Sequence, residues 1–227
     1  MDSSKPSNDR QPGERVLFWV FRKFFYRFLR LTTRNVMPLL FSMRVEGRYL
    51  LPESGGAMLL STHQSMMDPV LVGLTCNRTI NYLARHTLFK NPVFSFLIRI
   101  LDAIEIDRER GGLSGLREML KRLNRGEAVL LFPEGTRTQN GQIGTLKPGF
   151  IPIARRTSVP LVPIAIVGAY ECMPKGSKGI FANPICLVVG KPFLCEEYSQ
   201  WSDDQLLEQL GRRLHELHDR GRSLLPD

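Results

Sequence analysis

The sequence predicts an α/β domain with a central, mostly parallel sheet flanked by helices. Its 227 residues are 43% hydrophobic, which is enough for one domain with a packed core. From residue 44 onward, short apolar runs alternate with helical patterns, as in chains that build parallel sheets. Two polar motifs follow directly after apolar runs. The carboxyl ends of strands are where open α/β sheets bind ligands, so both motifs are candidate site segments.

The strands and helices are predicted from apolar runs and from the residues that begin or end helices. Asn91-Pro92 begins one helix, Gly126 closes another, Ser202 and Gln205 form a capping box, and Gly221 ends the last helix. Strands are expected at residues 45–49, 57–62, 79–84, 103–107, 128–132, 161–167 and 185–190. Helices are expected at residues 69–76, 91–101, 113–124 and 203–221.

The N-terminal region divides into two parts ahead of the domain at residues 45–227. Residues 1–13 are polar and are expected to be disordered, and residues 14–44 are expected to form amphipathic helices in a membrane interface. At helical spacing, one face holds Lys23, Arg27, Arg30 and Arg34, and the opposite face holds Phe18, Phe21, Phe25 and Phe28. Such a helix suits an anionic bilayer, although packing on the domain itself is the structural alternative. Nucleic acid fits poorly, because the aromatic rings lie opposite the charges.

The net charge and the cysteines narrow the class of protein. A formal charge of +9 indicates an anionic partner, such as a phosphorylated substrate, an anionic lipid or nucleic acid. The four cysteines form no CxxC pair, so we expect reduced thiols in a protein that faces the cytosol, and neither a disulfide framework nor a zinc site. No apolar run reaches the roughly 18 residues that a membrane span needs.

The first motif lies in residues 61–69, after the apolar run 57–60. His63 would lie at the carboxyl end of a strand and Asp68 at the mouth of a helix. A His and an Asp joined by such a loop can act as a general base and the group that orients it. The alternative is an ordinary helix start, in which Asp68 caps the helix and Pro69 takes its first position.

The second motif, Phe132-Pro133-Glu134-Gly135-Thr136-Arg137, also follows an apolar run. Gly135 allows close backbone approach, and Arg137 could bind a phosphate through two hydrogen bonds. Arg85 and Arg108 each follow a further predicted strand, and Lys147 is a weaker fourth candidate. Together these side chains indicate an anion site, although each one taken singly could be a solvated loop charge.

Four segments in one order resemble the 1-acylglycerol-3-phosphate acyltransferase family, whose members are membrane-associated enzymes that make phosphatidic acid. The first is a His followed by four residues and an Asp, in residues 62–68. The others are residues 85–89 with 106–108, residues 132–137, and the strand with Val-Pro at residues 159–164. The resemblance covers about residues 45–193. Thr62 and Thr87 depart from the family, which usually has Asn and often Glu at these positions.

The resemblance implies an enzyme that transfers an acyl group from acyl-CoA or acyl carrier protein to lysophosphatidic acid, without a cofactor. His63 would be the general base and Asp68 its partner. The substrate-binding residues would be Arg85, Arg108, Glu134, Gly135, Thr136, Arg137 and Lys147. The enzyme would work with membrane lipids as a peripheral or monotopic protein on the cytoplasmic face of a membrane, and would bind no nucleic acid. An acyltransferase with another acceptor, such as another lysolipid or glycerol 3-phosphate, and a non-catalytic lipid-binding module remain alternatives.

Overall fold

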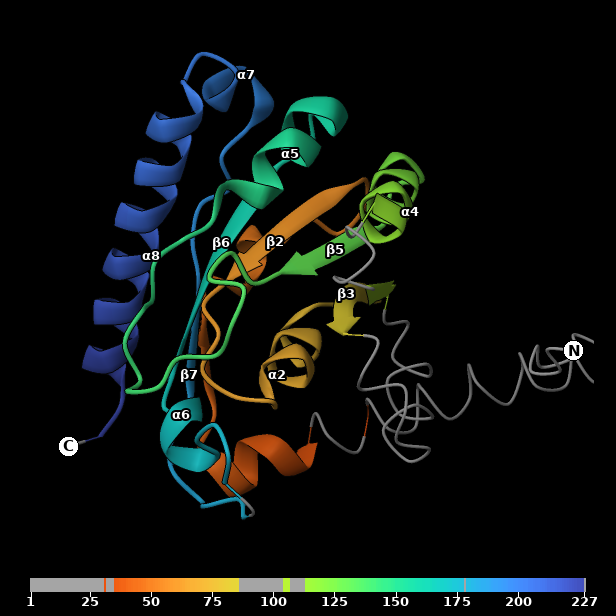
Figure 1. Cartoon of the computed structure of the whole chain (residues 1–227). Helices are drawn as coiled ribbons and strands as arrows, with labels where there is room; N and C mark the ends of the chain where they lie inside the picture. Colours follow the sequence, from red (N-terminus) through yellow and green to blue (C-terminus); the bar gives the residue numbers. More distant parts are fainter. Residues whose placement is uncertain (1–30, 32–34, 86–103, 107–112, 178, 227) are drawn as a thin grey trace, which may run out of the picture.

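The computed structural model describes residues 31, 35–85, 104–106, 113–177 and 179–226 (Figure 1). These residues form a seven-stranded sheet in the order β1-β7-β6-β2-β5-β3-β4. The strands are β1 (Arg44–Glu46), β2 (Ala57–Ser61), β3 (Ile80–Arg85), β4 (Ile104–Ile106), β5 (Ala128–Leu131), β6 (Leu161–Val167) and β7 (Cys186–Val189). Every pairing among these strands is parallel except that of β6 with β7, so the predicted mostly parallel sheet is confirmed.

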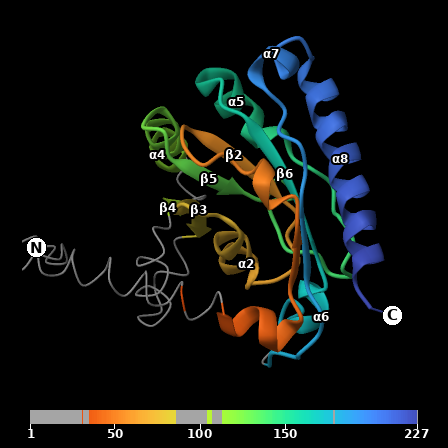
Figure 2. The ribbon, with the colours of Figure 1, turned by 180° about the vertical axis from the view of Figure 1, so that it is seen from behind.

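Helices cover both faces of this sheet (Figures 1 and 2). The helices are α2 (Asp68–Thr75), α4 (Leu113–Asn124), α5 (Ile151–Thr157), α6 (Ala169–Cys172), α7 (Cys195–Tyr198) and α8 (Asp203–Leu224), with 3-10 turns η1 (Arg48–Leu50) and η3 (Pro148–Phe150). Residues 35–41 are also helical. Successive strand residues point to opposite faces, so the central strands supply two separate cores. Leu59 of β2 packs in the core beneath α2, whereas Met58 and Leu60 pack in the core beneath α4, α5 and α8.

Most predicted elements are present, with ends shifted by one or two residues. The strand at 161–167 and the helix at 113–124 have the predicted bounds. The strand predicted at 45–49 is wrong at its second half, which forms η1 instead. Gly47 explains this early end, because it has a φ of +75° and a Cβ there would lie 2.2 Å from the carbonyl oxygen of Val189.

The final helix begins as predicted and ends later than predicted. Ser202 and Gln205 form the capping box at its start. The predicted stop at Gly221 is wrong, because α8 continues to Leu224. Gly221 is buried inside the helix, where a Cβ would lie 2.7 Å from Cγ2 of Val167. The glycine therefore permits close packing of α8 on β6 instead of ending the helix.

Several predictions fall outside the described residues. These are the disordered segment 1–13, nearly all of the amphipathic segment 14–34, the helix at 91–101, and residues Thr87 and Arg108. In the part of the chain that the structure describes, no helix is long and apolar enough to cross a membrane.

Candidate active site

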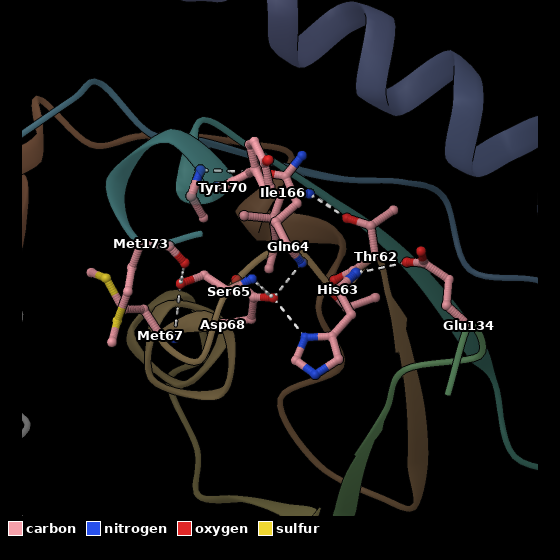
Figure 3. Close-up of polar contacts among 12 residues, drawn as sticks. Thr62, His63, Gln64, Ser65, Met67, Asp68, Glu134, Ile166, Tyr170 and Met173 are labelled. Atoms are coloured by element: carbon pink, nitrogen blue, oxygen red, sulfur yellow. Dashed lines mark hydrogen bonds and ion pairs between the residues drawn. The ribbon is translucent and has the colours of Figure 1, made fainter. Parts of the chain in front are cut away.

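The two sequence motifs meet because β6, β2 and β5 are neighbours in the sheet. Parallel strands bring their carboxyl ends to one edge, so the loop after β2, the loop after β5 and the start of α6 after β6 lie together. Figure 3 shows this cluster, with His63 and Asp68 from the first motif and Glu134 from the second.

Thr62 lets the chain leave the sheet immediately before His63. Its N–H donates to the carbonyl oxygen of Ile164, as the parallel ladder requires. Its side-chain oxygen, instead of its carbonyl, then accepts the N–H of Ile166 at 2.9 Å. An Asn side chain also has an oxygen that can accept such a bond. Thr62, which stands where the family usually has Asn, is 1% exposed and therefore lies in the protein interior at the end of β2.

His63 and Asp68 form a direct contact. Nδ1 of His63 lies 2.8 Å from Oδ2 of Asp68, and the histidine side chain remains 19% exposed. The same Asp68 oxygen accepts the N–H groups of Gln64 at 2.7 Å and Ser65 at 2.8 Å. The helix-cap interpretation is wrong in its detail: Asp68 begins α2, but Met67 is the N-cap residue and no side chain caps the helix.

Gln64 anchors the loop on its other side, a role that the sequence did not indicate. Its Nε2 donates to the carbonyl oxygen of Gly141 at 2.9 Å. Its Oε1 accepts the N–H groups of Ala169 at 3.1 Å and Tyr170 at 3.3 Å, at the start of α6. Because Gln64 is buried and bonded on both sides, it holds the backbone between His63 and Ser65 in place.

Glu134 holds the backbone of His63 from the second motif. Its Oε1 accepts the N–H of His63 at 2.8 Å, and its Oε2 accepts the N–H of Gly144 at 2.8 Å. The carbonyl oxygen of His63 accepts the N–H of Thr138 at 2.8 Å. Glu134 is 4% exposed, so its carboxylate shapes the site through these backbone groups.

Phe132 supports the ring of His63 from one side. The two rings are stacked with their centroids 3.9 Å apart and their planes 15° apart. This stacking holds the plane of the imidazole ring in place. The sequence placed Phe132 in the motif but gave no reason for it.

Two carboxyl groups of the site have shifted acidities. Burial raises the pKa of Asp68, and the hydrogen bonds from His63, Ser65 and Gln64 oppose that shift. Burial also raises the pKa of Glu134, and the N–H groups of Gly144 and His63 oppose it. The Oδ1 atom of Asp68 is buried without a hydrogen-bond partner among the described residues.

The structure describes some of the candidate anion-binding residues in full and others only in part or not at all. Gly135 has a φ of +70°, and a Cβ there would lie 3.3 Å from Cδ and Nζ of Lys147, so the lysine lies across this glycine. Thr136 is exposed and Arg137 is partly exposed in the same loop. Arg85 ends β3, although its side chain is outside the described residues, as is all of Arg108.

Comparison with known proteins identifies the family of the chain. The family model described as Acyltransferase matches residues 42–167, which contain both motifs. The chain belongs to the acyltransferase family. This confirms the resemblance to an acyltransferase family that the four sequence segments indicated. The names of individual relatives are more specific and agree with that resemblance.

The named relatives of this acyltransferase are 1-acyl-sn-glycerol-3-phosphate acyltransferases. The Bacillus subtilis protein is 28% identical over 201 residues, which cover 86% of this chain and 98% of that protein. A chloroplastic protein of Arabidopsis thaliana is 28% identical over 183 residues, which cover 78% of this chain and 51% of that protein. The chain therefore spans about half the length of the chloroplastic relative and nearly all of the bacterial one.

A solved structure resembles the acyltransferase over most of its length. The crystal structure of the 1-acyl-sn-glycerophosphate (LPA) acyltransferase PlsC from Thermotoga maritima superposes with a TM-score of 0.79 at 25% sequence identity. The match covers 95% of this chain and 90% of the Thermotoga chain. The predicted fold class is thus confirmed by a solved relative.

Proposed function

We propose that this acyltransferase moves a fatty acyl group from a thioester donor to the free hydroxyl of lysophosphatidic acid, giving phosphatidic acid. The donor would be acyl-CoA or acyl carrier protein, and no cofactor takes part. The names of the relatives support the acceptor, and the contact between His63 and Asp68 supports the mechanism.

The single observation that carries the proposal is the 2.8 Å contact between Nδ1 of His63 and Oδ2 of Asp68. With Nδ1–H donating to the carboxylate, Nε2 is left as the proton acceptor. Asp68 then fixes this tautomer and stabilises the imidazolium that forms. Phe132 stacks on the same ring and holds its plane in place.

The reaction then needs no covalent enzyme intermediate. Nε2 of His63 takes the proton of the acceptor hydroxyl as its oxygen attacks the thioester carbonyl carbon. The carbon–sulfur bond breaks, and the thiolate leaves with the proton that His63 returns. Ser65 takes no part in this step: its buried hydroxyl donates to the carbonyl oxygen of Met173 at 3.2 Å.

The acceptor phosphate would be bound by the cationic side chains near the second motif. Arg137 and Lys147 lie in the loop after β5, where Thr136 is exposed and adds a hydroxyl group. Arg85 at the end of β3 and Arg108 beyond β4 are the further proposed contacts. Arginine suits this role because its planar fork matches phosphate oxygens.

The substrate and the amphipathic sequence 14–34 together favour a peripheral or monotopic location on the cytoplasmic face of a membrane. A lysophospholipid acceptor resides in the bilayer, so the partners would be membrane lipids and the acyl donor, not nucleic acid. No disulfide forms among the described residues, which include all four cysteines, and this suits a reducing compartment.

A substrate panel tests the proposed function. The purified full chain would receive acyl-CoA or acyl carrier protein with lysophosphatidic acid, glycerol 3-phosphate or a lyso-aminolipid, and lipid products would be identified by mass spectrometry. We expect phosphatidic acid as the main product. Faster acylation of another acceptor would overturn the substrate assignment, and lipid binding without any product would favour the non-catalytic module.

A further inference from the structure

Five large apolar side chains are exposed on two segments that are far apart in the sequence. Leu39 is 84% exposed in the helix of residues 35–41, and Ile180 and Phe181 are 60% and 58% exposed in the loop after α6. We call the set of Val36, Leu39, Leu40, Ile180 and Phe181 the apolar rim.

The helical part of the apolar rim belongs to a helix that is apolar on two sides. Phe41 is buried and Met37 packs against the same core, so this side of the helix covers the domain. Val36, Leu39 and Leu40 are exposed nonetheless. A helix that is apolar all round normally has both sides covered. This helix therefore has a second apolar side that lacks a cover among the described residues.

The loop part of the apolar rim projects from the domain. A Cβ added at Gly176 or Gly179 would meet no atom within 4 Å, so the loop stands clear of its surroundings. Its end is nevertheless fixed, because the N–H of Phe181 donates to the carbonyl oxygen of Cys172 at 2.8 Å. Ile180 and Phe181 are therefore exposed on a loop whose end is hydrogen-bonded to α6.

The two segments lie at the same end of the molecule. The N–H of Ile185, just after the loop, donates to the carbonyl oxygen of Phe41 at 2.9 Å. In Figures 1 and 2, the orange-red helix of residues 35–41 and α6 lie together at the lower end, and α7 lies at the opposite end. The two segments that carry the apolar rim therefore lie near each other at one end of the molecule.

The loop is also bonded to both motifs of the candidate active site. The hydroxyl of Ser65 donates to the carbonyl oxygen of Met173 at 3.2 Å, as Figure 3 shows. Nζ of Lys175 lies 3.5 Å from Oγ1 of Thr136 in the second motif. Few residues thus separate the exposed apolar side chains from the loops that hold His63 and Glu134.

We propose that the apolar rim docks on a lipid bilayer, with Ile180 and Phe181 entering the interface and Lys175 close to anionic headgroups. This inference rests on the proposed function, because a lipid acceptor would then reach the site directly from the bilayer. The formal charge of +9 complements an anionic lipid surface. Docking through this loop also places the bilayer next to the first and second motifs.

Vesicle flotation tests the docking surface without relying on turnover. The full chain would be mixed with vesicles of equal parts phosphatidylcholine and phosphatidylglycerol. We expect I180S/F181S to lower the partition coefficient about tenfold or more, since two large apolar side chains no longer enter the interface. The apolar variant I180L/F181L should retain binding. L194S is the matched control, since Leu194 is 53% exposed at the start of α7.

The outcomes separate this inference from the proposed function. Binding by I180S/F181S equal to wild type would overturn the docking surface, even if phosphatidic acid is formed normally. The same variant losing thermal stability while binding vesicles normally would also overturn it, and would assign residues 1–34 or a second copy as the cover. Weakened binding in a protein that makes no phosphatidic acid would support docking and contradict the enzyme assignment.

Discussion

Oδ2 of Asp68 accepts hydrogen bonds from the ring of His63 and from the N–H groups of Gln64 and Ser65, all within 2.8 Å. One buried oxygen therefore fixes both the imidazole and the backbone that carries it. Because Asp68 is the first residue of α2, the position of the base is tied to a helix of the core.

Replacing Asp68 by Asn should remove the negative charge while keeping the size of the side chain. We expect kcat/KM for acyl transfer to fall about a thousandfold or more, because the amide no longer enforces the productive tautomer or stabilises the imidazolium. Steady-state kinetics would measure this. Asp204→Asn, at an exposed position of α8, is the control. Activity within twofold of wild type would show that the carboxylate is only structural.

Replacing Glu134 by Gln should loosen the first motif without touching the ring of His63. The amide supplies one acceptor where two N–H groups need one each, so one N–H loses its partner. We expect a loss of about 1–3 kcal/mol in unfolding free energy and a fall of about tenfold to a hundredfold in kcat/KM. Denaturant unfolding and kinetics measure the two effects. Glu208→Gln, in an exposed pair with Arg212, should change neither; equal behaviour of both variants would contradict this role.

The two glycines of α8 should respond oppositely to alanine. At Gly221 a Cβ would lie 2.7 Å from Val167, so Gly221→Ala should destabilise the fold by about 1–3 kcal/mol. At Gly211 the nearest atom would be Cδ1 of Leu146 at 3.6 Å, an ordinary contact. Gly211→Ala should therefore stabilise by about 0.5–1 kcal/mol through helix propensity. Thermal unfolding of the pair would detect this, and equal shifts would refute the packing role of Gly221.

His218 on α8 should make the free energy of unfolding depend on pH. Burial lowers the pKa of His218, and Arg222 lowers it further, whereas Asp219 opposes the shift. As pH falls below about 6.5, the unfolded chain binds the proton before the folded chain does. The free energy of unfolding should therefore fall with pH in that window and be unaffected by His218 above it.

A pair of histidine variants would isolate this contribution. His218→Gln should show a shallower loss of stability than wild type between about pH 7 and pH 5 in urea unfolding. His215→Gln, at an exposed position one turn away, should keep most of the wild-type slope, because His215 is the smallest of the causes that lower the pKa of His218. Parallel curves for wild type and His218→Gln would disprove the contribution of His218.

Much of the fold was predictable because its signals are local. The apolar run at residues 161–167 predicts a buried strand, and every residue of β6 is buried. Ser202 and Gln205 lie three residues apart, so the capping box that begins α8 can be recognised from the sequence. The error at Gly221 has the opposite origin. A glycine at the end of a leucine stripe resembles a stop signal, and only the approach of Val167 from β6 shows that it serves packing.

The sequence indicated the main residues of the site but not the contacts that hold them in place. The spacing of His63 and Asp68 and the motif at residues 132–137 indicated which side chains matter. Gln64 and Phe132 gave no such signal, because their partners Gly141 and His63 lie far away in the sequence. The short helix α5 was also missed, since Pro152 and two arginines obscure its apolar side.

The turnover of His63→Ala with an acyl thioester and lysophosphatidic acid tests the central claim most directly. The variant should fold, because Glu134 and Thr138 bind the backbone of residue 63 and not its ring. We expect phosphatidic acid formation to fall about a hundredfold to ten-thousandfold. His215→Ala, which removes an exposed histidine, should keep full activity. Wild-type turnover in a folded His63→Ala protein would contradict the assignment of His63 as the general base.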